Sequence, residues 1–155
     1  MAKNEPLEKL LWSIALPGFG QLLNGMYLKG VVLVALEFFI NVFGNINEVI
    51  ISSFQGNIET AIGQADFLYI MFYPCMYFFA MWDAYKDAGG GIKPFSFLPF
   101  VFGAYFMTVG VIYSSVFTFF GIMPGPIWLP LLSIIPGVFT GLLLQKILRK
   151  KQLNA

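Results

Sequence analysis

The chain consists largely of apolar stretches that are long and almost free of charge. Four of them, residues 30–46, 67–85, 97–120 and 127–147, meet or approach the length of about 20 apolar residues that a helix needs to cross a bilayer. Of the 155 residues, 58% are hydrophobic and only 11% are charged, whereas a soluble domain carries about a quarter charged residues. A soluble fold this small would leave too much apolar surface in water. We therefore predict an all-α membrane protein with four transmembrane helices in a single membrane domain, residues 1–155.

A fifth apolar stretch, residues 10–28, differs from the others because its centre breaks a helix. Pro17 removes a backbone donor, and Gly18 and Gly20 lower helix stability. A segment broken in this way can enter the membrane and return to the same side. We predict that residues 10–28 form an N-terminal re-entrant or interfacial helical hairpin.

The positions of the basic residues predict which side of the membrane each end of a helix faces. The bases are Lys3, Lys9, Lys29, Lys86, Lys93, Lys146, Arg149, Lys150 and Lys151. Cytoplasmic flanks of membrane helices carry the excess of lysine and arginine. Suppose that the first span runs outward, that the next three alternate in direction, and that residues 10–28 turn back within the membrane. All the bases then lie on the cytoplasmic side. Five crossings would instead place Lys3 and Lys9 outside. We therefore predict a multi-pass protein of the cell membrane with both termini in the cytoplasm, a cytoplasmic loop at 86–96 and a basic tail at 148–155.

The connection at residues 47–66 lies on the outer side in this topology. It contains acidic residues but no base. Apolar residues recur there at intervals of three or four, at Ile46, Ile50, Phe54, Ile58, Ile62 and Ala65. This spacing is typical of an amphipathic helix, which would lie flat on the outer leaflet or cap the bundle.

Three short motifs resemble a known family. They are PGFGQLLNG at residues 17–25, KG at 29–30 and WDAY at 82–85, late in a following helix. Together they resemble the two-transmembrane ("TM-two") domain family and its bacterial relatives, over about residues 10–87, or half the chain. The chain departs from the family at residues 22–23, where two leucines replace the usual aromatic pair. Members share no common activity, so the resemblance implies a membrane location and a helical hairpin, not a reaction.

The glycine-rich turn and the later aspartate give a first candidate site. A contact between Asp83 and the turn would explain why the two features occur together in similar proteins; the alternative is an interfacial charge among lipid headgroups. The candidate contact residues are Pro17, Gly18, Gly20, Gly25 and Asp83. The turn lacks the Lys-Ser/Thr ending of a phosphate-binding loop, so we do not expect it to bind a nucleotide.

Glu37 is a charged residue inside the first predicted span. It follows Gly30 by seven residues, which places it about 10 Å into the membrane at 1.5 Å per residue. A charge at such a depth costs about 2.5–3.5 kcal/mol, so Glu37 should face the bundle and find a partner. Asn41 lies on the same helical stripe, and Tyr77 of the neighbouring span is a candidate donor to either residue. Glu37, Asn41 and Tyr77 thus form a candidate polar cluster, which either binds a proton or cation or clamps two helices together.

Gly137 and Gly141 form a Gly-x-x-x-Gly pattern in the last predicted span. Small residues at this spacing let two helices approach closely. The partner helix belongs either to the same chain or to a second copy, so both intramolecular packing and a homodimer remain open.

The residues that are missing exclude several classes of chemistry. There is no histidine and only one cysteine, so we expect no Cys/His zinc site, no intramolecular disulfide and no serine–histidine triad. We predict no cofactor or metal, and the net charge of +1 gives no reason to expect nucleic acid. The leading hypothesis is a non-catalytic protein whose partners are the lipid bilayer and a second copy or another membrane protein. The alternative is a small transporter or channel element that uses Glu37.

Overall fold

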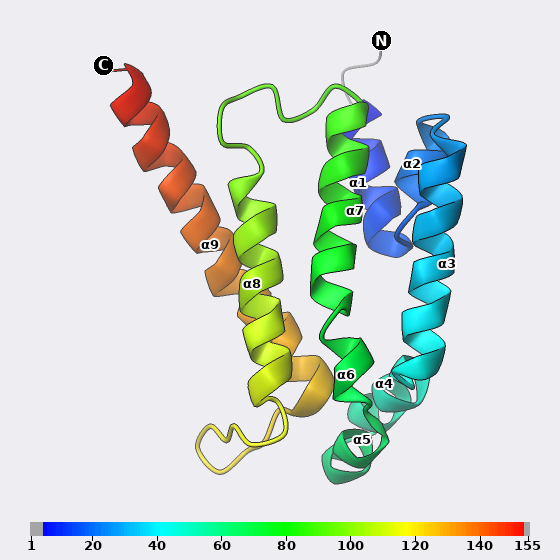
Figure 1. The fold of residues 1–155 in the computed structure, drawn as a ribbon. Coiled ribbons are helices and arrows are strands. Elements are labelled where there is room, and N and C mark those ends of the chain that lie inside the picture. The colour runs from blue at the N-terminus through cyan, green and yellow to red at the C-terminus, as the bar shows by residue number, and fades with distance from the viewer. Residues whose placement is uncertain (1–4, 154–155) are drawn as a thin grey trace.

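The computed structural model describes residues 5–153, and in this range the chain is all-helical apart from one isolated bridge, which confirms the predicted all-α class. The long helices run side by side as a bundle (Figure 1). The helices of the described range are α1 (Glu5–Ala15), α2 (Phe19–Leu23), α3 (Tyr27–Phe43), α4 (Ile46–Phe54), α5 (Ile58–Gln64), α6 (Phe67–Ile70), α7 (Tyr73–Asp87), α8 (Leu98–Tyr113) and α9 (Gly125–Leu153). Lys3 and the last two residues of the predicted basic tail lie outside the described residues.

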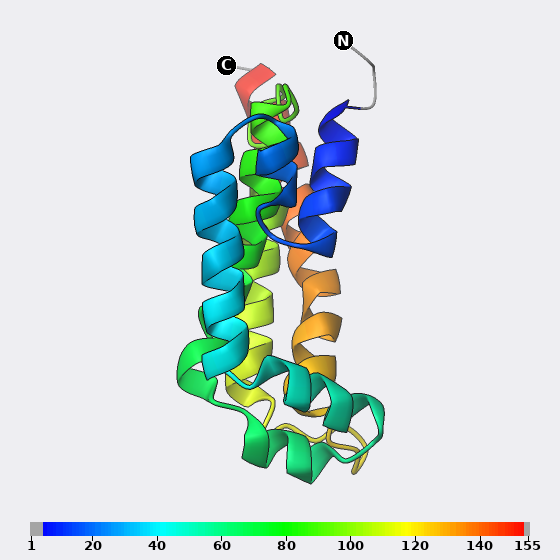
Figure 2. The same ribbon diagram turned by 90° about the vertical axis from the view of Figure 1, so that its right-hand side faces the viewer.

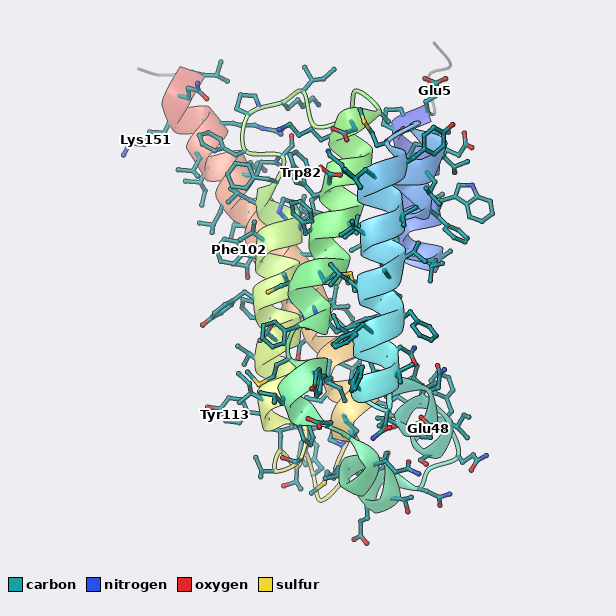
Figure 3. The ribbon with its side chains drawn as sticks, turned by 45° about the vertical axis from the view of Figure 1, so that its right-hand side comes forward. Glu5, Glu48, Trp82, Phe102, Tyr113 and Lys151 are labelled. Atoms are coloured by element: carbon teal, nitrogen blue, oxygen red, sulfur yellow. The ribbon has the colours of Figure 1, made fainter. Side chains whose placement is uncertain are left out.

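The two ends of the bundle differ in charge. Both ends of the described chain and the loop at 88–97 lie at one end, which we call the basic end, whereas α4, α5 and the segment 114–124 lie at the other (Figure 1). Figure 3 shows Glu5 and Lys151 at the basic end and Glu48 at the opposite end, which we call the acidic end. Both ends of the described chain therefore lie at the same end of the bundle, opposite α4 and α5.

The lengths of the helices do not establish four membrane spans. Among the described helices, only α9, with 29 residues, is long and apolar enough to cross a membrane by itself. Helices α3 and α4 would pass together, but the chain bends by 63° between them. At Asn45 the backbone is left-handed, with φ of 52°, a conformation that asparagine tolerates better than most residues. The structure therefore supports one membrane-spanning helix directly, or two if the bent pair α3 and α4 forms a single span.

The predicted helix boundaries hold to different degrees. The predicted span at 30–46 corresponds to α3 but lies three residues too late, and α9 extends the span predicted at 127–147 in both directions. The span predicted at 97–120 is too long, because α8 ends at Tyr113. Beyond it the chain turns back on itself, with φ of 48° at Phe120 and 78° at Gly121, and an isolated bridge joins Phe119 to Ile122.

A continuous helix over 67–85 is also wrong. The chain forms the single turn α6, breaks at residues 71–72 and resumes as α7, with Pro74 in the first helical turn. Proline has no N–H to donate to the preceding turn, so Pro74 fits the first turn of a helix, where that donor has no partner within the helix. The break sits near the acidic end, so α6 and α7 together still cover most of the length of the bundle (Figure 1).

The outer connection is two short helices, not the single amphipathic helix that the apolar spacing predicts. Gly56, with φ of 82°, separates α4 from α5. The pair lies across the acidic end of the bundle (Figure 2). Trp128 fastens it to α9, because its Nε1 donates to the carbonyl of Ser53 at 3.2 Å and its ring packs on Phe54 with 4.6 Å between centroids.

Helices α8 and α9 pack closely along most of their length, and small residues of α9 make this possible. A Cβ atom on Gly137 would lie 2.6 Å from the carbonyl oxygen of Phe102, and one on Gly141 would lie 2.5 Å from the Cα of Pro99. Both glycines are buried against α8. Their Gly-x-x-x-Gly pattern therefore serves packing within the chain, and neither glycine is left on the surface for a homodimer.

Large apolar side chains cover the outside of the bundle. Leu28, Phe38, Ile135 and Phe139 are 81%, 70%, 69% and 67% exposed. In water such surface would cost free energy in proportion to its area. The same surface is the expected exterior of a protein surrounded by lipid chains.

Candidate functional site

Helices α1 and α2 form a hairpin that enters the bundle from the basic end and stops partway. Helix α1 descends beside α7, the chain reverses at residues 16–18, and α2 leads back toward the start of α3 (Figure 2). At Gly18 the backbone is left-handed, with φ of 103°, a conformation that favours glycine. The helical hairpin predicted for residues 10–28 is therefore present, except that α1 already begins at Glu5.

Two glycines let the hairpin pack closely against its neighbours. A Cβ on Gly18 would lie 2.6 Å from the carbonyl oxygen of Gly30 in α3. A Cβ on Gly20 would collide with the Ser13 hydroxyl and would lie 2.7 Å from the Cβ of Ala84. Pro17 is fully buried in the same region. Gly25 has a different role: a Cβ there would meet open space, but its φ of 75° suits a turn.

The predicted contact between Asp83 and the turn exists, but an amide makes it. Gln21, which is fully buried in α2, donates from Nε2 to the carbonyl of Ala80 at 2.8 Å and to Oδ2 of Asp83 at 3.1 Å. Asn24 donates from Nδ2 to the carbonyl of Ala84 at 2.9 Å. The turn is therefore fastened to α7 by two side-chain amides, and the glycines supply only the close approach.

Lys29 completes this cluster at the basic end. Its Nζ lies 2.8 Å from Oδ1 of Asp83 and 2.8 Å from Oδ2 of Asp87. These hydrogen bonds, the one to Asp83 foremost, raise the pKa of Lys29 above its usual range. The lysine is about half exposed, so the ion pairs are partly screened by solvent. Gln21, Asn24, Lys29, Asp83 and Asp87 together form what we call the hairpin clamp.

The predicted polar cluster around Glu37 is only partly assembled. Tyr73, not Tyr77, donates to Oε1 of Glu37, at 3.2 Å. Tyr77 instead donates to the carbonyl of Ile14 at the end of α1. Asn41 turns away and donates to Oδ1 of Asn47 at 3.3 Å. The prediction that Tyr77 pairs with Glu37 or Asn41 is therefore wrong. The hydroxyl of Tyr77 is used instead by the carbonyl of Ile14, which lies near the end of α1.

Below the hairpin tip the bundle contains an apolar groove of about 610 Å³. It exists because α1 ends halfway down the bundle and leaves the surface between α7 and α9 uncovered (Figure 2). The side chains of Tyr73 and Tyr77 are the polar exceptions in its lining. The apolar residues that we use below to describe this hairpin groove are Ile14, Ile50, Phe54, Met107 and Ile134.

These features define the chain as a helical bundle with a clamped re-entrant hairpin and an apolar groove beneath its tip. Within residues 5–153, no group of three or more Cys, Asp or Glu lies close enough to hold a metal ion. No protein-family model, curated protein or solved structure matches the chain. The resemblance to the two-transmembrane domain family therefore stays a prediction.

The close packing of the hairpin gives a direct test. Replacing Gly20 by alanine places a methyl group against Ser13 and Ala84, and overpacking of this kind costs about 1–3 kcal/mol. Gly63 in α5 is the matched control, because a Cβ there meets nothing within 4 Å and alanine should stabilise the helix by about 0.5–1 kcal/mol. Thermal unfolding in detergent, followed by tryptophan fluorescence, should show a lower midpoint for Gly20→Ala and an unchanged or higher one for Gly63→Ala. Equal midpoints for the two variants would contradict the packing.

Proposed function

We propose that this chain is a non-catalytic, multi-pass integral membrane protein that holds a lipid acyl chain in the hairpin groove. In the proposed topology the basic end faces the cytoplasm. Helix α3, the pair α6–α7, and helices α8 and α9 cross the membrane, while the hairpin enters and returns. Support comes from three observations: the apolar exterior, the ability of α9 to span, and the separation of charge between the ends.

The charge separation favours this orientation over its inverse. The bases of the described residues lie in α1, at the start of α3, at the end of α7, in the loop at 88–97 and at the end of α9. The acidic end carries Glu48, Glu59 and Asp66 without a base. Lysine and arginine are retained on the cytoplasmic side during insertion. The re-entrant course of α1 and α2 is what allows Lys9 to stay on that side.

The hairpin groove is the single observation that carries the proposed binding function. Its volume of about 610 Å³ falls within the roughly 300–1,000 Å³ of small-molecule sites. Its walls offer almost no hydrogen-bonding groups, so water gains nothing by entering. In a bilayer, the groove would lie at the depth of the hydrocarbon core, where the available apolar ligand is an acyl chain.

The proposed topology predicts which residues reagents can reach. In a Cys75→Ala background, single cysteines are introduced at Asn57, on the exposed turn between α4 and α5, and at Lys93, in the loop of the basic end. A membrane-impermeant maleimide should label Asn57→Cys in intact cells, and Lys93→Cys only after the membrane is permeabilised. Labelling of both positions from outside, or the reverse pattern, would overturn the topology.

The binding function predicts that filling the groove releases lipid. Ile134 lines the groove, whereas its neighbour Ile135 is 69% exposed on the outer face of α9. Ile134→Trp should weaken the apparent affinity for phospholipid about tenfold, which corresponds to about 1.4 kcal/mol of lost binding, and so lower the fraction of protein that retains phospholipid. Ile135→Trp should match the unaltered protein. Native mass spectrometry from mild detergent measures this fraction, and equal retention in the two variants would count against the groove as a lipid site.

One observation on Glu37 supports a second candidate function, the movement of protons or cations across the membrane. Oε2 of Glu37 is buried in the bundle without a hydrogen-bond partner in the described part of the chain. Carboxylates inside membrane helices commonly belong to ion or proton pathways. Among the described residues, only Tyr73 bonds to this carboxyl group, and the neighbouring groove is apolar, so we rank this function below lipid binding.

Replacing Glu37 by glutamine separates the two functions. Glutamine keeps an acceptor for the hydroxyl of Tyr73 but cannot gain or lose a proton. If the chain moves protons, Glu37→Gln should abolish the decay of a pH gradient in reconstituted vesicles, while the exposed control Glu48→Gln should leave it unchanged. Vesicles that keep their gradient with the unaltered protein would remove this candidate.

A further inference from the structure

A second pocket, of about 770 Å³, opens at the basic end and is separate from the hairpin groove. It lies between the start of α1, the end of α9 and the loop at 88–97. Figure 1 shows these three segments gathered at the same end of the bundle. Its lining, unlike that of the groove, combines basic and polar side chains with apolar ones, so it suits a ligand with two different parts. We call it the basic-end pocket.

The polar side of this pocket is built from side chains that hold one another in place. Arg149 donates from Nε to the carbonyl of Pro94 at 2.8 Å and from a terminal nitrogen to the Ser96 hydroxyl at 3.3 Å. Gln145, only 9% exposed, donates to the same hydroxyl at 3.3 Å. The guanidinium group is thus positioned by the loop before any ligand arrives, which lowers the entropy cost of binding.

The charge of the pocket is unbalanced. Lys93 and Arg149 line it, and no carboxylate of the described residues does. The ion pairs found among residues 5–153 use other bases: Lys9 pairs with Glu8, and Lys29 is held in the hairpin clamp. Two cations without a carboxylate partner attract an anion, and an arginine matches the oxygens of a phosphate particularly well.

The pocket lining also includes apolar side chains. They are Leu7 and Leu10 of α1, Phe100 of α8 and Leu142 of α9. Leu7 is 52% exposed and Leu142 49% exposed, so this apolar surface is open to the surroundings of the bundle. A free inorganic anion would leave it uncovered, whereas the acyl chains of a lipid would cover it.

We propose that the basic-end pocket binds an anionic phospholipid of the cytoplasmic leaflet. Lys93 and Arg149 contact the headgroup phosphate, and the acyl chains lie along Leu7, Leu10 and Leu142. The site rests on the membrane topology of the proposed function, because that topology places the pocket at headgroup level. It does not depend on occupancy of the hairpin groove.

The test compares pocket variants with a tail variant of equal charge. Lys93→Gln removes an exposed charge whose side chain forms no hydrogen bond within the described residues; Arg149→Gln removes the second. Lys151→Gln is the control, since this lysine lies in the last turn of α9 and outside the pocket. The thermal midpoint of each purified protein is measured during titration with phosphatidylglycerol, with zwitterionic phosphatidylcholine and with inorganic phosphate.

Phosphatidylglycerol should raise the midpoint of the unaltered protein and of Lys151→Gln at the same lipid concentration. Each pocket substitution should weaken the apparent affinity about fivefold, because it removes a charged contact with the headgroup phosphate that Lys151 does not make. Lys93→Gln removes no side-chain hydrogen bond of the described residues. It therefore still tests the site if Arg149→Gln fails to fold.

Three results would overturn the proposal. The first is an equal response to phosphatidylglycerol in Lys93→Gln and Lys151→Gln, and the second is an equal response to phosphatidylcholine. The third is a pocket-dependent response to inorganic phosphate as large as that to the lipid, which would assign the site to free anions. If cysteine labelling meets expectation while this titration fails, the pocket alone is refuted; if labelling fails, the proposed topology is refuted as well.

Discussion

The structure depends on how the broken end of α1 satisfies its backbone polar groups. The last carbonyls of a helix have no partner within the helix, and hydrocarbon offers none. Tyr77 supplies one by donating to the carbonyl of Ile14. Gln21 then ties the returning helix α2 to α7 by donating to the carbonyl of Ala80. These two bonds, one donated by α7 and the other accepted by it, hold a non-helical reversal of the chain inside the bundle.

The length of the hairpin determines where the bundle is closed and where it is open. Above the tip, the hairpin covers α7 and is fastened to it by Gln21 and Asn24, while the ion pairs of Lys29 join the start of α3 to α7. Below it, no helix of the described range replaces α1, so the side chains of Met107 and Ile134 border a groove. A full-length helix in place of the hairpin would have filled this space. The groove and the reversal are therefore two results of the same break at Pro17.

Much of this architecture can be predicted from local chemistry. Pro17 and Gly18 are enough to predict the break, and the spacing of Gly137 and Gly141 predicts a packing face. The clamp is harder to predict, because Gln21 is ordinary in sequence and becomes a buried donor only when α2 meets α7. The same limit explains the error at Tyr77. Spacing along the helices predicts similar depths for Tyr77 and Glu37, but it does not predict that the hairpin tip presents the carbonyl of Ile14 to Tyr77.

The pair of helices α4 and α5 affects how a ligand would enter and leave the hairpin groove. Ile50 and Phe54 close the groove toward the acidic end, and the bond from Trp128 to Ser53 holds that floor to α9. The hairpin tip forms the ceiling. In the proposed topology, with both of these routes closed, a guest would have to enter sideways, within the plane of the bilayer. Occupancy would then follow the mole fraction of that guest among its neighbours and not its concentration in water, so dilution of the sample in buffer would barely change it.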